Sequence, residues 1–144
     1  MNRFERAVDI LVEAYHNRTL ERRKCSRCAV GNILGNSYWS LLFATGDSGS
    51  EWYEEEYWDD PETAIRVVGV GPAYGTMAEE ILIESIYESE YSIKELAMIE
   101  QRFEKTGRET GSNLKALYSI VELMASWEDL NINIEQVKDR FVLA

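Results

Sequence analysis

Histidine, cysteine and proline are the scarce residues of this sequence. Among 144 residues there are one histidine, two cysteines and two prolines. A small secreted scaffold held together by disulfides contains far more cysteine than this. With a single histidine, the serine and threonine residues form no recognisable catalytic triad. The low cysteine and histidine content therefore argues against a disulfide-rich scaffold and a serine hydrolase.

The sequence also lacks a long apolar run. Its longest nearly uncharged stretch, residues 28–45, is interrupted by glycine, asparagine and serine, whereas a membrane helix needs about 20 consecutive apolar residues. The first thirteen residues contain Glu5, Asp9 and Glu13, unlike the basic start and apolar core of a secretory signal. We therefore predict no transmembrane segment and a cytoplasmic location.

Basic residues are few and unevenly placed. The formal net charge is −11, which divides into +3 for residues 1–27, −13 for residues 28–100 and −1 for residues 101–144. Attraction between Lys or Arg and phosphate supplies most non-specific binding to nucleic acids. An acidic middle of this kind repels phosphate, so we predict no direct binding to nucleic acids.

Helical periodicity is the strongest positive signal, and the chain length suits one domain. Asn2 and Glu5 form a capping pair that predicts a helix over residues 3–17. Thr76 and Glu79 open a second pattern, whose expected core face consists of Ala78, Ile81, Leu82, Ser85 and Ile86. We predict an all-α fold in which residues 1–144 form a single compact bundle of about five helices.

The C-terminal half carries the clearest helical pattern. Ser92 and Glu95 form a capping box, and we expect Gly107 to end that helix. The following stripe predicts an antiparallel neighbour and consists of Leu114, Leu117, Tyr118, Val121, Met124 and Ala125. Asn133 and Gln136 then begin a short helix that carries Ile134, Val137 and Phe141 and folds back onto the others.

The middle of the sequence is acidic, aromatic and irregular. We predict a short helix near Tyr38–Thr45 and a loop after it. Residues 63–70 contain β-branched side chains, but a lone strand has no partner here, so we favour helix or irregular structure.

His16, Cys25 and Cys28 are the candidate metal ligands. The Cys-x-x-Cys spacing suits zinc, or a cycle between dithiol and disulfide, although a structural zinc site normally has four protein ligands. The alternative interpretation is that Cys28 is a small buried hydrophobic residue and His16 is a polar residue near a helix end.

The acidic segment, residues 51–62, is the candidate partner-binding region. It holds seven carboxylates, interleaved with Trp52, Tyr53, Tyr57 and Trp58. Aromatic residues dominate interface hot spots, and an acidic surround steers basic partners. The segment also complements in charge the five cations near Cys25, which are Arg18, Arg22, Arg23, Lys24 and Arg27.

Three segments carry a resemblance to known proteins. They are the opening Asn-Arg-Phe-Glu, the segment Cys25-Ser-Arg-Cys28-Ala-Val-Gly-Asn32, and Tyr-Ser-Ile-Lys-Glu-Leu-Ala-Met-Ile-Glu at residues 91–100. With them the chain resembles a family of small proteins of Bacteroidota and their mobile elements, for which no function is established. The resemblance spans most of the chain except residues 47–75. It implies a shared fold and supplies no catalytic residue.

We therefore expect a non-enzymatic protein-interaction or accessory protein that binds a protein partner or a second copy of itself. A zinc or thiol-redox site at His16, Cys25 and Cys28 is the first alternative. An unrecognised enzyme ranks last, because no nucleophile and base are paired in the sequence.

Overall fold

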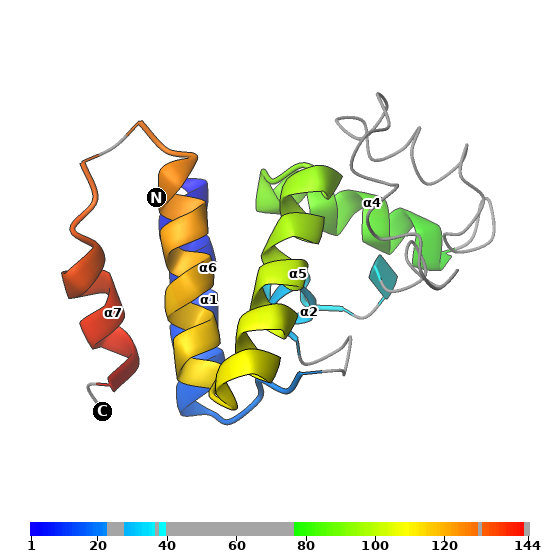
Figure 1. The fold of residues 1–144 in the computed structure, drawn as a ribbon. Helices are drawn as coiled ribbons and strands as arrows, with labels where there is room; N and C mark the ends of the chain where they lie inside the picture. Colours follow the sequence, from blue (N-terminus) through cyan, green and yellow to red (C-terminus); the bar gives the residue numbers. More distant parts are fainter. Residues whose placement is uncertain (23–27, 37, 40–76, 130, 143–144) are drawn as a thin grey trace.

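The computed structural model describes residues 1–22, 28–36, 38–39, 77–129 and 131–142, and within them it is an all-α fold (Figure 1). The helices are α1 (Arg3–His16), α2 (Ala29–Leu34), α4 (Met77–Ser89), α5 (Ile93–Thr110), α6 (Asn113–Ser126) and α7 (Ile134–Val142). None of these described helices has both the length and the apolar character needed to cross a membrane. The predicted fold class is confirmed. Of the helix expected near Tyr38–Thr45 only Tyr38 and Trp39 are described, and the segment 63–70 lies outside the described residues.

Side-chain caps fix the beginnings of the predicted helices. The Asn2 side chain accepts a hydrogen bond from the backbone N–H of Glu5 at 2.8 Å. At the start of α5, Ser92 Oγ accepts from the N–H of Glu95 at 3.1 Å, and Glu95 Oε1 accepts from the N–H of Ser92 at 2.9 Å. Asn133 caps α7 in the same way as Asn2 caps α1. Each cap satisfies backbone donors that the first turn of a helix leaves unpaired.

The end of α5 differs from the prediction. Gly107 does not end the helix, which continues to Thr110 and stops at Gly111 in the left-handed conformation, with φ +68°. Glycine adopts this conformation readily because it has no Cβ. Gly107 is instead buried within α5, and a Cβ added there would overlap the side chain of Arg22. The absence of a side chain at Gly107 therefore serves close packing and not helix termination.

The helices enclose one hydrophobic core. α5 and α6 form the predicted antiparallel pair, α1 lies beside α6, and α7 packs against both α1 and α6 (Figure 1). The short α2 contacts α1, α4 and α5. Side chains with no more than 2% exposure come from all six helices and include Leu11, Val30, Leu82, Phe103, Leu117 and Phe141. In the predicted α6 stripe, Leu117, Val121 and Met124 are buried, and Leu114, Tyr118 and Ala125 are partly buried against the core.

One residue of the predicted α4 core face lies elsewhere. Leu82, Ser85 and Ile86 are buried, but Ile81 keeps 37% of its surface exposed. At 100° per residue, Ile81 is 100° from Leu82 and projects from the edge of the buried face. α4 therefore presents an apolar side chain to solvent beside its exposed glutamates.

Arg3 joins three distant parts of the chain. Its Nε and Nη2 donate to the carboxylate of Glu128 at 3.1 Å each, and its Nη1 donates at 3.0 Å to both Glu95 Oε1 and the carbonyl oxygen of Glu90. The guanidinium carbon also lies 4.6 Å from the centre of the Tyr91 ring. The hydrogen bonds to Glu128 and then those to Glu95 raise the pKa of Arg3 above its ordinary value. This cluster ties the start of α1 to the start of α5 and to the segment after α6.

Candidate binding groove on α5 and the buried thiol

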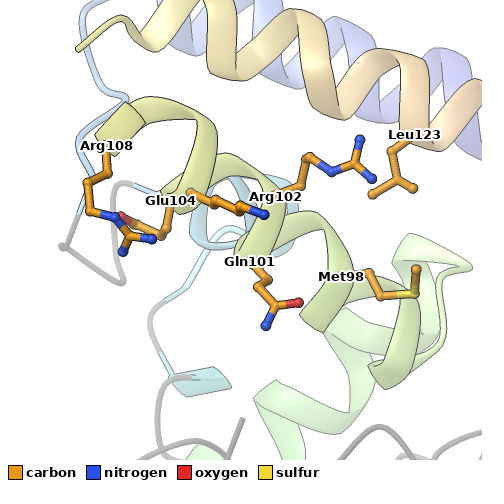
Figure 2. Close-up of a pocket in the computed structure, with 7 residues that line it drawn as sticks. Met98, Gln101, Arg102, Glu104, Arg108 and Leu123 are labelled. Carbon is orange, nitrogen blue, oxygen red and sulfur yellow. The ribbon is translucent and has the colours of Figure 1, made fainter. Parts of the chain in front are cut away.

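A groove of about 530 Å³ runs along the outer side of α5, with Leu123 of α6 on its wall (Figure 2). Figure 2 shows Met98 and Arg108 at opposite ends of the row of α5 side chains, and Arg102 reaching toward the α6 side. The groove is lined by Met98, Gln101, Arg102, Glu104, Lys105, Arg108 and Leu123.

Three cations dominate the charge of this groove. Arg102, Lys105 and Arg108 are spaced three residues apart, which places them along one side of α5 over about 9 Å. All three are exposed. Arg102 donates a long hydrogen bond to Ser119 Oγ at 3.5 Å. Within the described part of the chain, none of the three takes part in an ion pair.

The groove combines this charge with apolar surface. Met98 and Leu123 are both partly buried and line the same groove as the cations. Methionine is unbranched and adapts to different apolar partners. The arrangement fits an extended or helical segment that carries carboxylates and at least one large apolar side chain.

Sequence patterns did not reveal this groove. Residues 101–144 are nearly neutral, so the local charge balance hides the row of cations. The expected end at Gly107 also placed Arg108 beyond the helix, which broke the three-residue spacing. The signal that was present is the spacing of Arg102, Lys105 and Arg108 in a helix that extends to Thr110.

His16 lies at the last position of α1 and contacts α7. Its Nε2 is 3.0 Å from the backbone oxygen of Arg140, and its ring packs edge-on against Tyr15. The histidine is exposed and occupies the helix-end position that the alternative interpretation expected.

Cys28 lies at the N-cap of α2 and is only 1% exposed. Its Sγ accepts a hydrogen bond from the N–H of Gly31 at 3.3 Å. Cys28 thus behaves as a buried residue that caps a helix, while His16 contacts Arg140 of α7 and Tyr15 of its own helix. Cys25 lies outside the described residues. Within the described ranges, no group of three or more potential ligands is placed to hold a metal ion.

A buried carboxyl group on α5 faces the thiol. Glu100 Oε2 is enclosed and has no hydrogen-bond partner among the described residues. Burial raises the pKa of Glu100 well above its usual range, and the neighbouring carboxyl of Glu104 raises it further. Hydrogen bonds with the Cys28 thiol and the backbone N–H of Val30 lower the pKa of Glu100, but by less than burial raises it. Glu100 therefore retains its proton to higher pH than an exposed glutamate.

The pair of Glu100 and Cys28 is poorly suited to thiol catalysis. A nucleophilic cysteine needs a thiolate that a substrate can reach, and positive charge or a base beside it. Cys28 is enclosed, and burial raises the pKa of the Glu100 carboxyl next to it, which makes that group a donor of a proton and not a source of positive charge. Movement of α2 away from α5 would have to precede any reaction at the sulfur.

The candidate partner-binding residues Trp52, Tyr53, Tyr57 and Trp58 lie outside the described residues, so their contact with a partner stays a prediction. Comparison of the chain with family models, with curated proteins and with solved structures finds no match. The resemblance to the Bacteroidota family accordingly stays a prediction as well.

Proposed function

We propose that this chain is a non-enzymatic interaction protein that binds an acidic segment of a partner protein in the α5 groove. One observation carries the proposal: three neighbouring cations, none of which forms an ion pair with another described residue, line a groove in a chain whose net charge is −11. Clusters of arginine and lysine are a recurrent means of recognising acidic motifs.

Charge and apolar contact contribute differently to such binding. Each exposed ion pair contributes about 0–1 kcal/mol, because both charges are well solvated before they meet. Burial of one large apolar side chain against Met98 and Leu123 contributes about 1.5–3 kcal/mol. The cost of association offsets much of this gain, so we expect weak and readily reversible binding.

The overall negative charge does not prevent this binding. At physiological ionic strength, interactions between exposed charges are largely screened beyond about 8 Å. A carboxylate seated in the groove is nearer to Arg102, Lys105 and Arg108 than to most of the acidic surface. Binding should weaken as salt is added.

The test uses a fluorescent peptide with the sequence of residues 51–62 as an acidic, aromatic probe. Fluorescence anisotropy should show saturable binding to the intact chain and at least tenfold weaker binding to Arg102→Glu/Arg108→Glu. The matched control is Lys94→Glu/Lys115→Glu, which makes the same change in net charge at exposed positions outside the groove. Equal loss of binding in both variants, or no binding to the intact chain at millimolar concentration, would refute the proposal.

The zinc or thiol-redox hypothesis stays the alternative proposal for His16, Cys25 and Cys28, and an unrecognised enzyme stays the last. Metal analysis separates the first alternative from the interaction function, because binding of the acidic probe in the α5 groove requires no metal.

A further inference from the structure

The exposed face of α4 has an unusual composition. Glu80, Glu84 and Glu88 are exposed and follow one another at four-residue spacing, so they lie along one side of the helix over about 12 Å. Met77 and Ile81 project from the same side, with 75% and 37% of their surfaces exposed. The α4 acidic face, defined by these five residues, thus mixes carboxylates with apolar side chains.

This face carries an electrostatic cost in a single protomer. Like charges four residues apart in a helix repel one another and destabilise it slightly. No cation of the described residues forms an ion pair with Glu80, Glu84 or Glu88. A cationic surface laid against the α4 acidic face would relieve this repulsion.

The α5 groove has the complementary composition. It offers three cations over about 9 Å, together with Met98 and Leu123. Within one protomer the α4 acidic face and the α5 groove form no ion pairs with each other, because α4 packs against α2 through its opposite side. The charged side chains of both surfaces are exposed and form no ion pairs within the described part of the chain.

We propose that the α4 acidic face of one copy docks into the α5 groove of a second copy. The inference rests on the proposed function and names its partner as the chain itself. The contact joins two different surfaces, so it is heterologous: it closes into a ring, or continues as a chain of copies, according to the rotation between neighbours. Its ionic component makes the association sensitive to salt.

The experiment is sedimentation velocity on the full chain over a wide concentration range at low and high salt. The groove variant is Arg102→Glu/Arg108→Glu, and the face variant is Glu80→Lys/Glu84→Lys. We expect the intact chain to self-associate and each variant alone to associate at least tenfold more weakly. An equimolar mixture of the two variants should regain association, because each then offers a surface that complements the other.

The net charges make this rescue specific. The groove variant has a net charge of −15 (−11 − 4) and the face variant −7 (−11 + 4). Both remain negative, so general attraction between oppositely charged proteins cannot restore association in the mixture. Lys94→Glu/Lys115→Glu is the control: it has the same net charge of −15 (−11 − 4) as the groove variant but keeps both docking surfaces, so it should self-associate like the intact chain. All substituted residues are exposed, and circular dichroism verifies that each variant keeps its helices.

The outcomes separate this inference from the proposed function. Rescue in the mixture supports docking of α4 in the groove. Loss in both variants without rescue overturns it, as does unchanged association in either variant. If the intact chain remains monomeric while the acidic peptide binds in the groove, the self-docking inference is wrong and the proposed function stands.

Discussion

Replacing Arg3 with methionine should remove a large polar contribution to the stability of this fold. Methionine keeps an apolar stem over Tyr91 but has no guanidinium, so the variant isolates the charge and its hydrogen bonds. The side chains of Arg3, Glu95 and Glu128 are only 22%, 23% and 11% exposed to solvent. Removal of Arg3 therefore leaves two mostly buried carboxylates without their shared cation.

The expected loss follows from these contacts. Breaking a buried ion pair by removing one partner costs about 3–5 kcal/mol, and the residual exposure here places the loss at the lower end, about 3 kcal/mol. For a chain near this size, that corresponds to a fall in melting temperature of about 6–12 °C. Urea denaturation followed by circular dichroism measures the free energy of unfolding, and a thermal scan measures the melting temperature.

Arg6 provides the matched control. It lies one helical turn after Arg3 and pairs with Glu90, but the two side chains are 37% and 57% exposed. Exposed pairs contribute about 0–1 kcal/mol after solvent screening, so Arg6→Met should change the free energy of unfolding by less than 1 kcal/mol. Equal losses for Arg3→Met and Arg6→Met would refute the reasoning. So would simple additivity of Arg3→Met with Glu128→Gln, since residues in direct contact are expected to couple.

Three further predictions test other parts of the structure. Glu100→Gln should flatten the pH dependence of stability: the folded chain holds this proton more tightly than the unfolded chain, so its contribution is complete below about pH 4.5 and is lost as pH rises through the raised pKa. Urea titrations between pH 5 and 8 measure this, and identical slopes for variant and wild type would contradict it. Phe141→Ala should release α7, because Phe141 is its only fully buried side chain and nine residues are too few for a stable isolated helix. Hydrogen exchange should then accelerate over residues 134–142, and unchanged protection there would show another anchor. The zinc hypothesis predicts near-stoichiometric zinc in the wild type, measured by elemental mass spectrometry, and its loss in Cys25→Ser, with Cys28→Ser as a second variant whose hydroxyl can still cap α2.

The sequence was sufficient to predict the helices whose signals are local. The capping residues Asn2, Ser92 and Asn133 and the apolar stripes that follow them lie within a few residues of one another. Their helical structure therefore depends little on the rest of the chain. The same local signals failed at Gly107, because a glycine in a sequence does not show whether it adopts a positive φ or lies beneath a distant side chain. Arg22, which packs against Gly107, is 85 positions away in the sequence.

The features that depend on tertiary packing could not be predicted. Arg3 contacts Glu95 and Glu128 across 92 and 125 residues, and Glu100 faces Cys28 only because α2 packs beside α5. Ile81 was placed in the core because periodicity gives the direction of a side chain but not the width of the face that a neighbouring helix covers. The groove also depends on tertiary packing, because the row of cations lies on α5 but Leu123 on the wall of the groove belongs to α6.

The charge of the chain bears on how the unpaired cations should be interpreted. There are 26 acidic and 15 basic side chains, so carboxylates outnumber cations. A shortage of carboxylates therefore does not explain why a basic residue forms no ion pair. Arg3, Arg6, Lys138 and Arg140 each pair with a carboxylate on another element. Among the described residues, Arg18, Arg22, Lys94 and Lys115 form no ion pair either, but Arg102, Lys105 and Arg108 differ from them in following one another along a single groove. Helix stability alone accounts for little of this arrangement, because a favourable interaction with the dipole is confined to the last turn and involves Arg108 only. This row of cations forms no ion pair within the described residues, which supports the proposal that carboxylates of another molecule bind it.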